Sequence, residues 1–456
     1  MARDVSDTQI VETRAELARW FEAGCKPASD YRVGAEHEKV PFFKRTLAPV
    51  PYAGPNGVDA LLHRMQAKLG WSSIEDKDHL IGLFDEVGKG AISLEPGGQF
   101  ELSGAPCETI HEVRDELTAH LNACRAVAAP LDIGFLTLGM SPKWTRAETP
   151  VMPKSRYAIM ARYMPKVGGH GLDMMFRTTT VQANLDFSSE ADMVAKLRLG
   201  VAAQPIITAL FANSPFTDGV PNGYLSMRSA IWLDTDAQRT GMMPFAFEPG
   251  FGFEAYVDYA LDVPMYFVKR GDVYHDVAGA SFRDLLAGRL AQLPGERATM
   301  SDWANHLSTI FPEVRLKRYL EMRGADLGPP ERILALQAFV VGLYYDRVAL
   351  DEALAVVKDW SAADRLALRR DVPKLALKCQ VAGRGARDVA RDLLAISARG
   401  LKRRARLDAE GRDETHYLDC LLAIAESGRT AAEDWLDAYN GRWRGQIDRV
   451  FDEATF

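Results

Sequence analysis

The sequence has few cysteines and no clusters of cysteine and histidine. Its five cysteines are dispersed over 456 residues, and none forms a Cys-X-X-Cys pair. Structural zinc sites are built from such closely spaced pairs, so a structural zinc site is not expected. Cys107 and Cys124 lie on or near one predicted helix, whose rise separates them by far more than the reach of a disulfide. Free thiols are therefore the default expectation.

An excess of positive charge and long apolar runs are also lacking. The formal net charge is -7, so nothing in the overall charge favours nucleic acid or an anionic membrane as a partner. The longest apolar runs, around 201–212 and 334–345, are too short and too interrupted to span a bilayer. The amino terminus has no apolar signal core and is too acidic for a transit peptide. We therefore expect a cytosolic protein, a monomer or a homodimer, that binds neither nucleic acid nor membrane.

Two short alternating runs are joined by Pro96-Gly97-Gly98, within the stretch 90–103. Glycines supply the backbone freedom that a hairpin turn needs, and the period of 2 is that of strands. Glu95 and Glu101 then share one face of a sheet. Neighbouring carboxylates repel each other unless a cation neutralises them, although a solvated face remains the alternative.

Three further segments alternate in the same way and carry polar residues on one face. The segment 31–43 places Glu36 and Glu38 on one face and His37 on the other. The remaining polar positions are Gln182 and Asn184 in 178–187, and Arg315, Lys317, Tyr319, Glu321 and Arg323 in 314–326. In addition, Arg228 lies in an otherwise apolar segment and needs an acidic partner, which is either protein or substrate. Such faces either meet water or line a site.

These segments and the intervening helical patterns predict an α+β protein. We expect helices over 8–24, 58–69, 109–130, 188–213 and 301–312, and further strands over 132–140 and 263–269. After residue 328 the pattern becomes helical throughout. We therefore expect a sheet-rich catalytic region, 1–328, with a helical carboxyl-terminal region, 329–456, packed on it.

The polar faces together offer many carboxylates without clustered cysteine or histidine. Such oxygen ligands suit Mg²⁺ or Mn²⁺ rather than zinc. Hard cations beside arginine and lysine suit a nucleoside triphosphate, and phosphoryl transfer is the expected reaction. No Walker loop or kinase signature is present, so the nucleotide must be held by another architecture.

At this point the motifs resemble a known family, the glutamate-cysteine ligases of the plant and proteobacterial type. The resemblance is carried, in collinear order, by the segments 32–39, 93–106, 179–187, 225–232 and 315–326. It implies the glutamine-synthetase-like fold, in which a curved antiparallel sheet forms an active-site funnel with helices on its outer face. It also implies that ATP phosphorylates the γ-carboxylate of L-glutamate and that the amine of L-cysteine displaces the phosphate, giving γ-glutamylcysteine.

The resemblance implies the following residue roles in this sequence. Glu36, Glu38, Glu95, Glu101 and Glu321 would hold the Mg²⁺ ions, with Gln182 and Asn184 beside them; Lys317 and Arg315 would face the phosphates; Arg323 would meet the transferred phosphoryl group; Arg228 and Arg156 would orient amino-acid carboxylates; Tyr266 and Phe187 would line the cysteine pocket. Related bacterial ligases carry a histidine near the position of Gln182. Glutamine cannot accept a proton, so Glu38 or Glu101 is the better candidate for a general base.

Two alternatives stay open at this point. A few pocket side chains decide the acceptor, so the enzyme could join glutamate to another amine. A chain that binds metal and nucleotide without turnover is the other alternative, although all five acidic positions are present.

Overall fold

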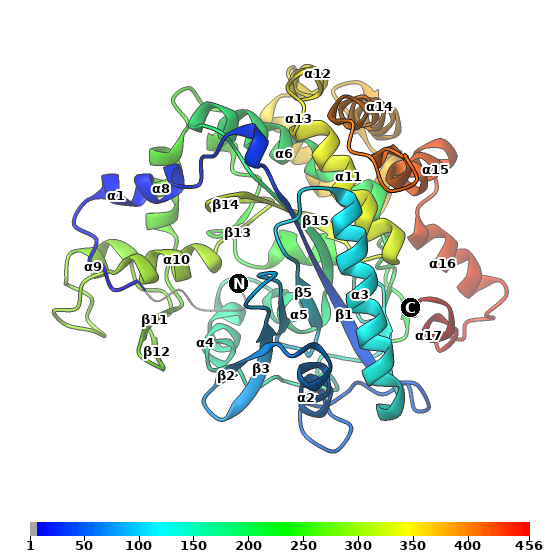
Figure 1. Ribbon diagram of the computed structural model, residues 1–456, viewed down its shortest axis with the longest axis horizontal. Helices are drawn as coiled ribbons and strands as arrows, with labels where there is room; N and C mark the ends of the chain where they lie inside the picture. Colours follow the sequence, from blue (N-terminus) through cyan, green and yellow to red (C-terminus); the bar gives the residue numbers. More distant parts are fainter. Residues whose placement is uncertain (1–6) are drawn as a thin grey trace.

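The structure is a computed structural model that describes residues 7–456. Its centre is a nine-stranded antiparallel sheet, crossed by the long strand β1 (Figure 1). The strand order is β14 (Val314–Leu316), β15 (Leu320–Asp326), β7 (Thr180–Leu185), β1 (Val33–Phe43), β5 (Phe100–Ser103), β4 (Ala91–Leu94), β3 (His79–Phe84) and β2 (Ser72–Asp76), and β6 (Ile133–Leu136) pairs with the second half of β1. The expected α+β class with an antiparallel sheet is confirmed.

The register of the sheet places the predicted polar residues on one face. Glu38 pairs with Glu101, Glu36 pairs with Gln182, and Glu321 pairs with Asn184. Because side chains at directly paired positions point the same way, four neighbouring strands contribute to one polar face. We call this the cavity face.

The hairpin predicted over 90–103 is present as β4 and β5. Ile92 and Phe100 are fully buried on its apolar face. Gly98 has φ +88° in the connecting turn, a backbone conformation that favours glycine. Glu95 follows β4 directly, so it lies beside Glu101 as expected.

The single strand expected over 314–326 is instead the hairpin β14–β15. The chain turns at Lys317–Tyr319, where the Lys317 amide donates to the Tyr319 carbonyl at 2.8 Å. Arg315 and Glu321 become cross-strand partners and still share the cavity face. The even spacing that suggested one strand therefore gave the right face but the wrong topology. The hairpin β2–β3 was not predicted.

Long helices cover the other face, the helix face. They are α3 (Ile110–Ala128) on β1 and β6, α6 (Glu190–Phe211) on β14 and β15, and α11 (Pro330–Tyr344) on β1 and β7 (Figure 1). The Thr109 hydroxyl caps α3 by accepting from the Glu112 amide, and Ser189 caps α6 in the same way, one residue after the expected start.

Among residues 7–456, α6 is long and apolar enough to cross a membrane by length and composition. This differs from the expectation that the run around 201–212 is too short. The most apolar window of α6 is 83% buried inside the molecule, which is the position of a core helix. Helices α11 and α12 (Arg347–Val357) pass the same test only together, across a bend of 93°.

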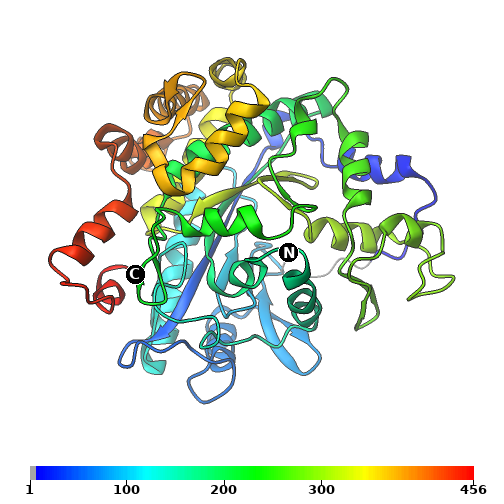
Figure 2. The ribbon, with the colours of Figure 1, turned by 180° about the vertical axis from the view of Figure 1, so that it is seen from behind.

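Shorter elements lie over the cavity face (Figure 2). They include α4 (Ser155–Tyr163), α5 (Gly171–Arg177), α7 (Met227–Ile231), and the small hairpin β11–β12 (Phe267–Arg270 and Val273–Asp276). The strand expected over 263–269 is therefore found as β11, which begins at Phe267, four residues later than expected. Two-residue strands form three further pairs: β8 (Phe216–Thr217) with β9 (Val220–Pro221), β10 (Thr240–Gly241) with β13 (Phe311–Pro312), and β16 (Gln380–Val381) with β17 (Arg384–Gly385).

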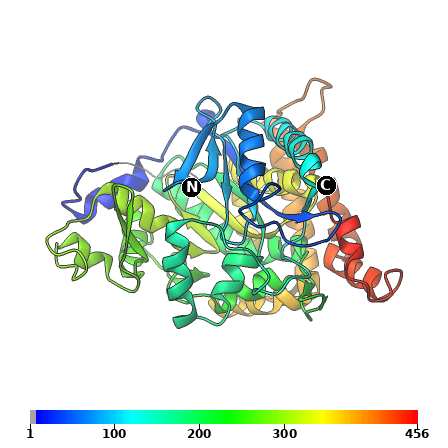
Figure 3. The same cartoon turned by 90° about the horizontal axis from the view of Figure 1, so that it is seen from below.

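The remaining helices complete the periphery. They are α1 (Arg14–Glu22), α2 (Val58–Leu69), α8 (Phe253–Asp262), α9 (Phe282–Leu286), α10 (Met300–Ser308), α13 (Ala362–Leu375), α14 (Ala386–Arg404), α15 (Asp419–Ser427), α16 (Ala431–Asn440) and α17 (Arg449–Glu453). The α1, α8 and α10 group and the α16–α17 pair lie at opposite ends of the molecule (Figure 3). Helix α2 has the predicted bounds and ends at Gly70 with φ +70°.

Candidate active site

Three cavities adjoin one another along the cavity face. We call the one over the centre of the sheet the inner cavity. Its volume is about 110 Å³, and its lining includes Glu36, Glu38, Glu95, Glu101, Arg156, Gln182, Arg315 and Arg323. Eight of the residues that the sequence singled out therefore meet around one space, although they come from β1, β5, β7, β14, β15, α4 and the turn after β4.

Three carboxylates crowd one side of the inner cavity. Burial, together with the charges of Glu95 and Glu101, raises the pKa of Glu38 well above its usual range. Burial and Glu101 likewise raise the pKa of Glu95 to about 7. Glu101 accepts from the hydroxyls of Ser93 (3.0 Å) and Ser103 (2.6 Å). The negative charge on this acidic side is therefore not fully neutralised by the surrounding protein.

The opposite side of the inner cavity is basic. Glu321 is fully buried and contacts Arg315 (Nε to Oε2, 2.5 Å), Arg323 (Nη1 to Oε2, 3.2 Å) and the Lys317 ammonium. Although burial opposes ionisation, these three cations hold the pKa of Glu321 well below its usual range. One carboxylate among three cations leaves a local positive excess, which suits a polyanionic ligand.

Gln182 and Asn184 connect the two sides. Arg323 donates from Nη1 to Gln182 Oε1 at 2.8 Å. Asn184 donates from Nδ2 to Glu36 Oε1 at 2.8 Å, and its Oδ1 has no hydrogen-bond partner among the described residues. A buried amide oxygen without a partner is costly unless a ligand or water supplies one.

Arg228 enters the site from the short helix α7. Its side chain is 3% exposed, and it donates from Nη2 to the Arg323 carbonyl at 2.8 Å. The Ser226 hydroxyl caps α7 by accepting from the Ser229 amide, and it donates to Asp326 Oδ1 at 2.8 Å. Asp326 is the buried last residue of β15, so the sheet itself fixes the start of α7.

Helix α13 of the carboxyl-terminal region holds α7 from the other side. Arg369 forms a buried ion pair with Glu313 and donates to the hydroxyl (3.0 Å) and carbonyl (3.1 Å) of Ser229. The Pro373 carbonyl accepts from the amides of Leu225 and Ser226. The segment that carries Arg228 is therefore held by Arg369 and Pro373, which lie one turn apart on α13.

A methionine-lined cavity of about 90 Å³ continues from the inner cavity towards α5. Its lining includes Met160, Met174, Met175, Thr178, Thr180, Trp232 and Arg228, and it shares Glu38, Glu95, Gln182 and Arg323 with the inner cavity. Its walls combine apolar side chains with the guanidinium groups of Arg228 and Arg323 and the carboxylates of Glu38 and Glu95. The cavity therefore suits a small ligand with an anionic group and an aliphatic body.

A larger cavity, the open cavity, lies beyond Glu36 and Asn184. Its volume is about 380 Å³, and its lining includes Lys26, Arg32, Phe84, Lys89, Asp186 and Tyr319. The sequence flagged Arg32 only as part of the strand 31–43. Lys26, Phe84 and Lys89 were missed because they lie on a loop and on the unpredicted β3 side of the sheet.

Two predicted pocket residues, Phe187 and Tyr266, are not among the side chains that line these cavities. Phe187 is fully buried in the apolar core, where its ring lies 5.9 Å from that of Phe253. Tyr266 is 1% exposed, with the Arg239 guanidinium 3.8 Å from its ring centre. Both side chains belong to apolar clusters of buried residues, and their assignment to the cysteine pocket stays a prediction. The pattern alone gave no signal to distinguish a core aromatic from a pocket aromatic.

The oxygen donors fit a hard divalent cation. The charge of Glu101 raises the pKa values of Glu38 and Glu95, and the charge of Glu95 also raises that of Glu38, a repulsion that a cation would relieve. Within residues 7–456 no three histidine, cysteine, aspartate or glutamate side chains converge on one ion position. Mg²⁺ is usually bound through one or two carboxylates, with phosphates and water completing its octahedron. The residue set therefore fits Mg²⁺ shared with a phosphorylated ligand.

All five cysteines are free thiols, including Cys107 and Cys124. The default expectation from sequence is confirmed.

Comparison with known proteins identifies the family. Residues 32–453 match the family described as glutamate-cysteine ligase family 2. The chloroplastic glutamate–cysteine ligases of Nicotiana tabacum and Medicago truncatula are each 52% identical over 97% of this chain, covering 83% and 85% of their own lengths. The expectation of a cytosolic location is contradicted, because these relatives are named chloroplastic.

Solved structures agree on the fold. A glutamate–cysteine ligase from Francisella tularensis, in complex with AMP, matches with a TM-score of 0.54 at 13% identity, covering 93% of this chain and 87% of its own. A bifunctional glutathione synthetase from Pasteurella multocida matches with a TM-score of 0.51 at 13% identity, covering 96% of this chain and 53% of its own. At this identity the likeness concerns the fold alone. The family match over most of the chain and the close relatives together show that the chain belongs to glutamate-cysteine ligase family 2.

Proposed function

We propose that the cavity face catalyses ATP-dependent joining of the L-glutamate γ-carboxylate to the amine of L-cysteine through a γ-glutamyl phosphate. This reaction is the first step of glutathione synthesis. The observation that carries the proposal is the inner cavity, where excess carboxylate faces excess cation between the open and the methionine-lined cavities. We assign catalysis to region 1–328, with region 329–456 packed on it and supplying Arg369.

Glu36, Glu38, Glu95 and Glu101, with the Gln182 and Asn184 amides beside them, would hold Mg²⁺ or Mn²⁺. When bound, the ion would neutralise phosphate charge and polarise the transferred phosphoryl group. Glu321 is also proposed as a ligand, although in this conformation Arg315, Lys317 and Arg323 surround it. Release of those cations to a triphosphate would free its oxygens.

The open cavity is the proposed nucleotide site. It has room for a base and ribose, and Lys26, Arg32 and Lys89 supply positive charge at its walls. It meets the inner cavity at Glu36 and Asn184, so a nucleotide lying there would direct its phosphates towards Arg315 and Lys317. The AMP complex of the Francisella tularensis ligase supports a nucleotide on this fold.

Glutamate is proposed to lie in the methionine-lined cavity. Arg228 would hold its α-carboxylate at the end furthest from the phosphates, and the γ-carboxylate would reach the inner cavity. Arg323 lines both cavities, so its guanidinium is placed to stabilise the negative charge that develops on the phosphoryl group during transfer. Preorganised charge, rather than a protein nucleophile, is what phosphoryl transfer requires.

The acceptor amine must lose a proton before it attacks the acyl phosphate. Gln182 cannot accept a proton. Glu38 and Glu101 line the inner cavity, and either carboxylate is the proposed base. Arg156, which lines the inner cavity but not the methionine-lined cavity, would hold the acceptor carboxylate. The amine then displaces phosphate from the γ-carbonyl, and the peptide-like bond forms.

The experiment is ADP release by the purified protein with Mg-ATP and L-glutamate, with and without L-cysteine, coupled to mass spectrometry of the product. We expect ADP release that requires cysteine, together with a γ-glutamylcysteine mass. A chelator should stop the reaction and Mg²⁺ should restore it. ADP release only with another amine would change the substrate, and no ADP with any amine would leave a binding protein.

A further inference from the structure

Strand β15 contains a β-bulge: between Met322 and Ala325 it advances three residues while β7 advances two. In a regular strand, Arg323 and Asp326 would point to opposite faces, because they lie three residues apart. The extra residue of the bulge instead pairs Asp326 with Thr180, which lines the methionine-lined cavity. The bulge therefore lets one strand direct Arg323 into the inner cavity and also use Asp326 to hold the start of α7.

Gly324 lies in this bulge and has no room for a side chain. An added Cβ would lie 2.1, 2.5 and 2.8 Å from Nε2, Cδ and Cγ of Gln204, which are its three nearest atoms. The φ of Gly324 is not positive, so packing against Gln204, rather than backbone strain, excludes a larger residue. The Gly324 carbonyl also accepts from the Thr208 hydroxyl at 3.0 Å.

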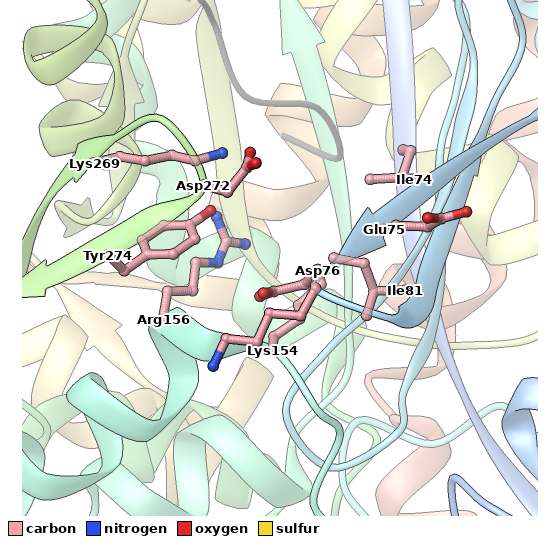
Figure 4. A pocket seen from close by; sticks show the side chains of 10 residues that line it. Ile74, Glu75, Asp76, Ile81, Lys154, Arg156, Lys269, Asp272 and Tyr274 are labelled. Atoms are coloured by element: carbon pink, nitrogen blue, oxygen red, sulfur yellow. The ribbon is translucent and has the colours of Figure 1, made fainter.

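Gln204 and Thr208 lie one turn apart on α6, and both are at most 1% exposed. Neither lines the open, inner or methionine-lined cavity, or the cavity of about 300 Å³ between the hairpins β2–β3 and β11–β12 (Figure 4). Among the described residues, the Gln204 side-chain amide has no hydrogen-bond partner. A buried amide without partners is costly, so what Gln204 contributes is its fit against the bulge.

On the cavity face, the bulge connects two arginines of the proposed reaction. The Arg323 carbonyl accepts from Arg228 Nη2 at 2.8 Å and from the Thr180 hydroxyl at 3.3 Å. A shift of this peptide would therefore move Arg323 and Arg228 together, relative to the carboxylates on β1 and β5. A misplacement of about 1 Å in a catalytic arrangement can cost about 10²-fold in rate, so the position of the bulge matters for turnover.

We propose that Gln204 and Thr208 are positioning residues for the reaction. From the helix face they fix the bulge, and the bulge fixes the spacing between Arg228, which would hold glutamate, and Arg323, which would meet the phosphoryl group. This inference rests on the proposed function and adds two residues that lie outside its cavities.

The first test removes the Thr208 hydroxyl. Thr208→Val keeps the shape of the side chain and should lower kcat for cysteine-dependent ADP release about threefold to tenfold, the range of one buried hydrogen bond. Thr208→Ser keeps the hydroxyl and should stay within about twofold of the wild type. In an Arg323→Ala background, Thr208→Val should cost less than about twofold in kcat, because the group that it positions is gone.

Ser397→Ala is the matched control. Ser397 on α14 is buried, and its hydroxyl donates to the Phe339 carbonyl of α11 at 2.9 Å. The variant therefore also removes a buried bond from a hydroxyl to a backbone carbonyl. It should lower the thermal unfolding temperature about as much as Thr208→Val does, while its kcat stays that of the wild type.

A second pair of variants tests the fit between Gly324 and Gln204. Gly324→Ala should lower kcat at least about tenfold, because the new methyl group meets the Gln204 amide and displaces the bulge. Adding Gln204→Ala removes all three of the atoms that crowd this methyl group. The double variant should therefore regain at least about fivefold in kcat over Gly324→Ala alone.

Wild-type kcat in Thr208→Val, with only a lower unfolding temperature, would show a merely structural role and overturn the inference. An undiminished effect in the Arg323→Ala background, an equal loss of kcat in Ser397→Ala, or a Gly324→Ala defect that Gln204→Ala does not relieve would also overturn it. A wild-type protein that forms no γ-glutamyl product would overturn the proposed function itself, so the two failures are distinguishable.

Discussion

The ionisable side chains on the two faces of β1 lie in opposite electrostatic environments. On the cavity face, Glu36 and Glu38 meet other carboxylates and amide groups that leave charge for a ligand to neutralise. On the helix face, His37 and Lys39 are at most 1% exposed, and the Lys39 ammonium lies 2.9 Å from His37 Nδ1. Burial lowers the pKa of Lys39 to about 8 and that of His37 well below its usual range.

This difference indicates that, along β1, the helix face contributes to stability and the cavity face to activity. The helix face suppresses charge by burial under α3, where His120 also has a lowered pKa. The cavity face keeps charge of both signs apart, with Glu321 strongly ionised and Glu38 destabilised. Substitutions on the cavity face should therefore change turnover, whereas substitutions towards the helix face should change stability.

Glu38→Gln should give the largest effect. We expect turnover to fall at least about 10³-fold, because a neutral amide replaces a proposed ligand and candidate base. The thermal unfolding temperature in the absence of metal should not fall, since a repelling carboxylate is removed. Steady-state ADP release and circular dichroism measure the two quantities. Turnover close to that of the wild type would remove Glu38 from the site.

Arg323→Ala should lower kcat about 10²- to 10³-fold, the usual range for loss of a preorganised group that stabilises transition-state charge. KM for glutamate should change much less, because the interaction strengthens during phosphoryl transfer. Arg318→Ala is the control, since Arg318 lies in the turn of the same hairpin and points outward to the Trp20 carbonyl. An effect confined to glutamate binding would give Arg323 a substrate-binding role instead.

Arg369→Lys tests whether the carboxyl-terminal region positions Arg228. Lysine keeps a positive charge beside Glu313 but cannot make both contacts to Ser229. We expect KM for glutamate to rise about threefold to tenfold, with kcat within about twofold. Arg370→Lys, the exposed neighbour paired with Asp371, should be silent. A fall in kcat alone would argue against positioning through α7.

Glu116→Gln is the control for Glu38→Gln, because Glu116 is a partly buried carboxylate on the helix-face side of the sheet. Glu116 lies on α3 and accepts from the Ala105 amide at 2.7 Å, and burial raises its pKa to about 7. A folded-state pKa above the unfolded value of about 4.5 gives stability that is full below pH 4.5 and lost as the pH rises to 7.

The variant should therefore match the wild type at pH 4.5 and exceed its free energy of unfolding by about 1–2 kcal/mol at pH 8. Its turnover should be that of the wild type. Urea unfolding at both pH values measures the first quantity, and a pH-independent difference would show that Glu116 does not carry the shift.

The sequence predicted the cavity face well, because alternation reports faces even where topology is wrong. Arg315 and Glu321 fall on the same face whether 314–326 is one strand or a hairpin, since cross-strand partners point the same way. Alternation also separated Glu36 and Glu38 from His37. It could not show that Asp326 and Arg369 hold α7, because those contacts join residues about 100 to 140 positions apart.

Other parts of the site depended on tertiary packing. Phe187 and Tyr266 belong to buried apolar clusters, and no local pattern distinguishes that from lining a pocket. The hairpin β2–β3 was missed although Ile74, Leu80 and Leu83 are apolar on either side of Lys77–Asp78. A turn search over that stretch could have found it.

The account's central claim is that the carboxylates of the cavity face form a hard-cation site completed by nucleotide. The most direct measurement is equilibrium binding of Mn²⁺, followed by electron paramagnetic resonance, with a non-hydrolysable ATP analogue present. Wild type and Glu116→Gln should bind the ion equally, and Glu38→Gln and Glu95→Gln should each weaken binding at least about tenfold. Wild-type affinity in both cavity-face variants would contradict the account.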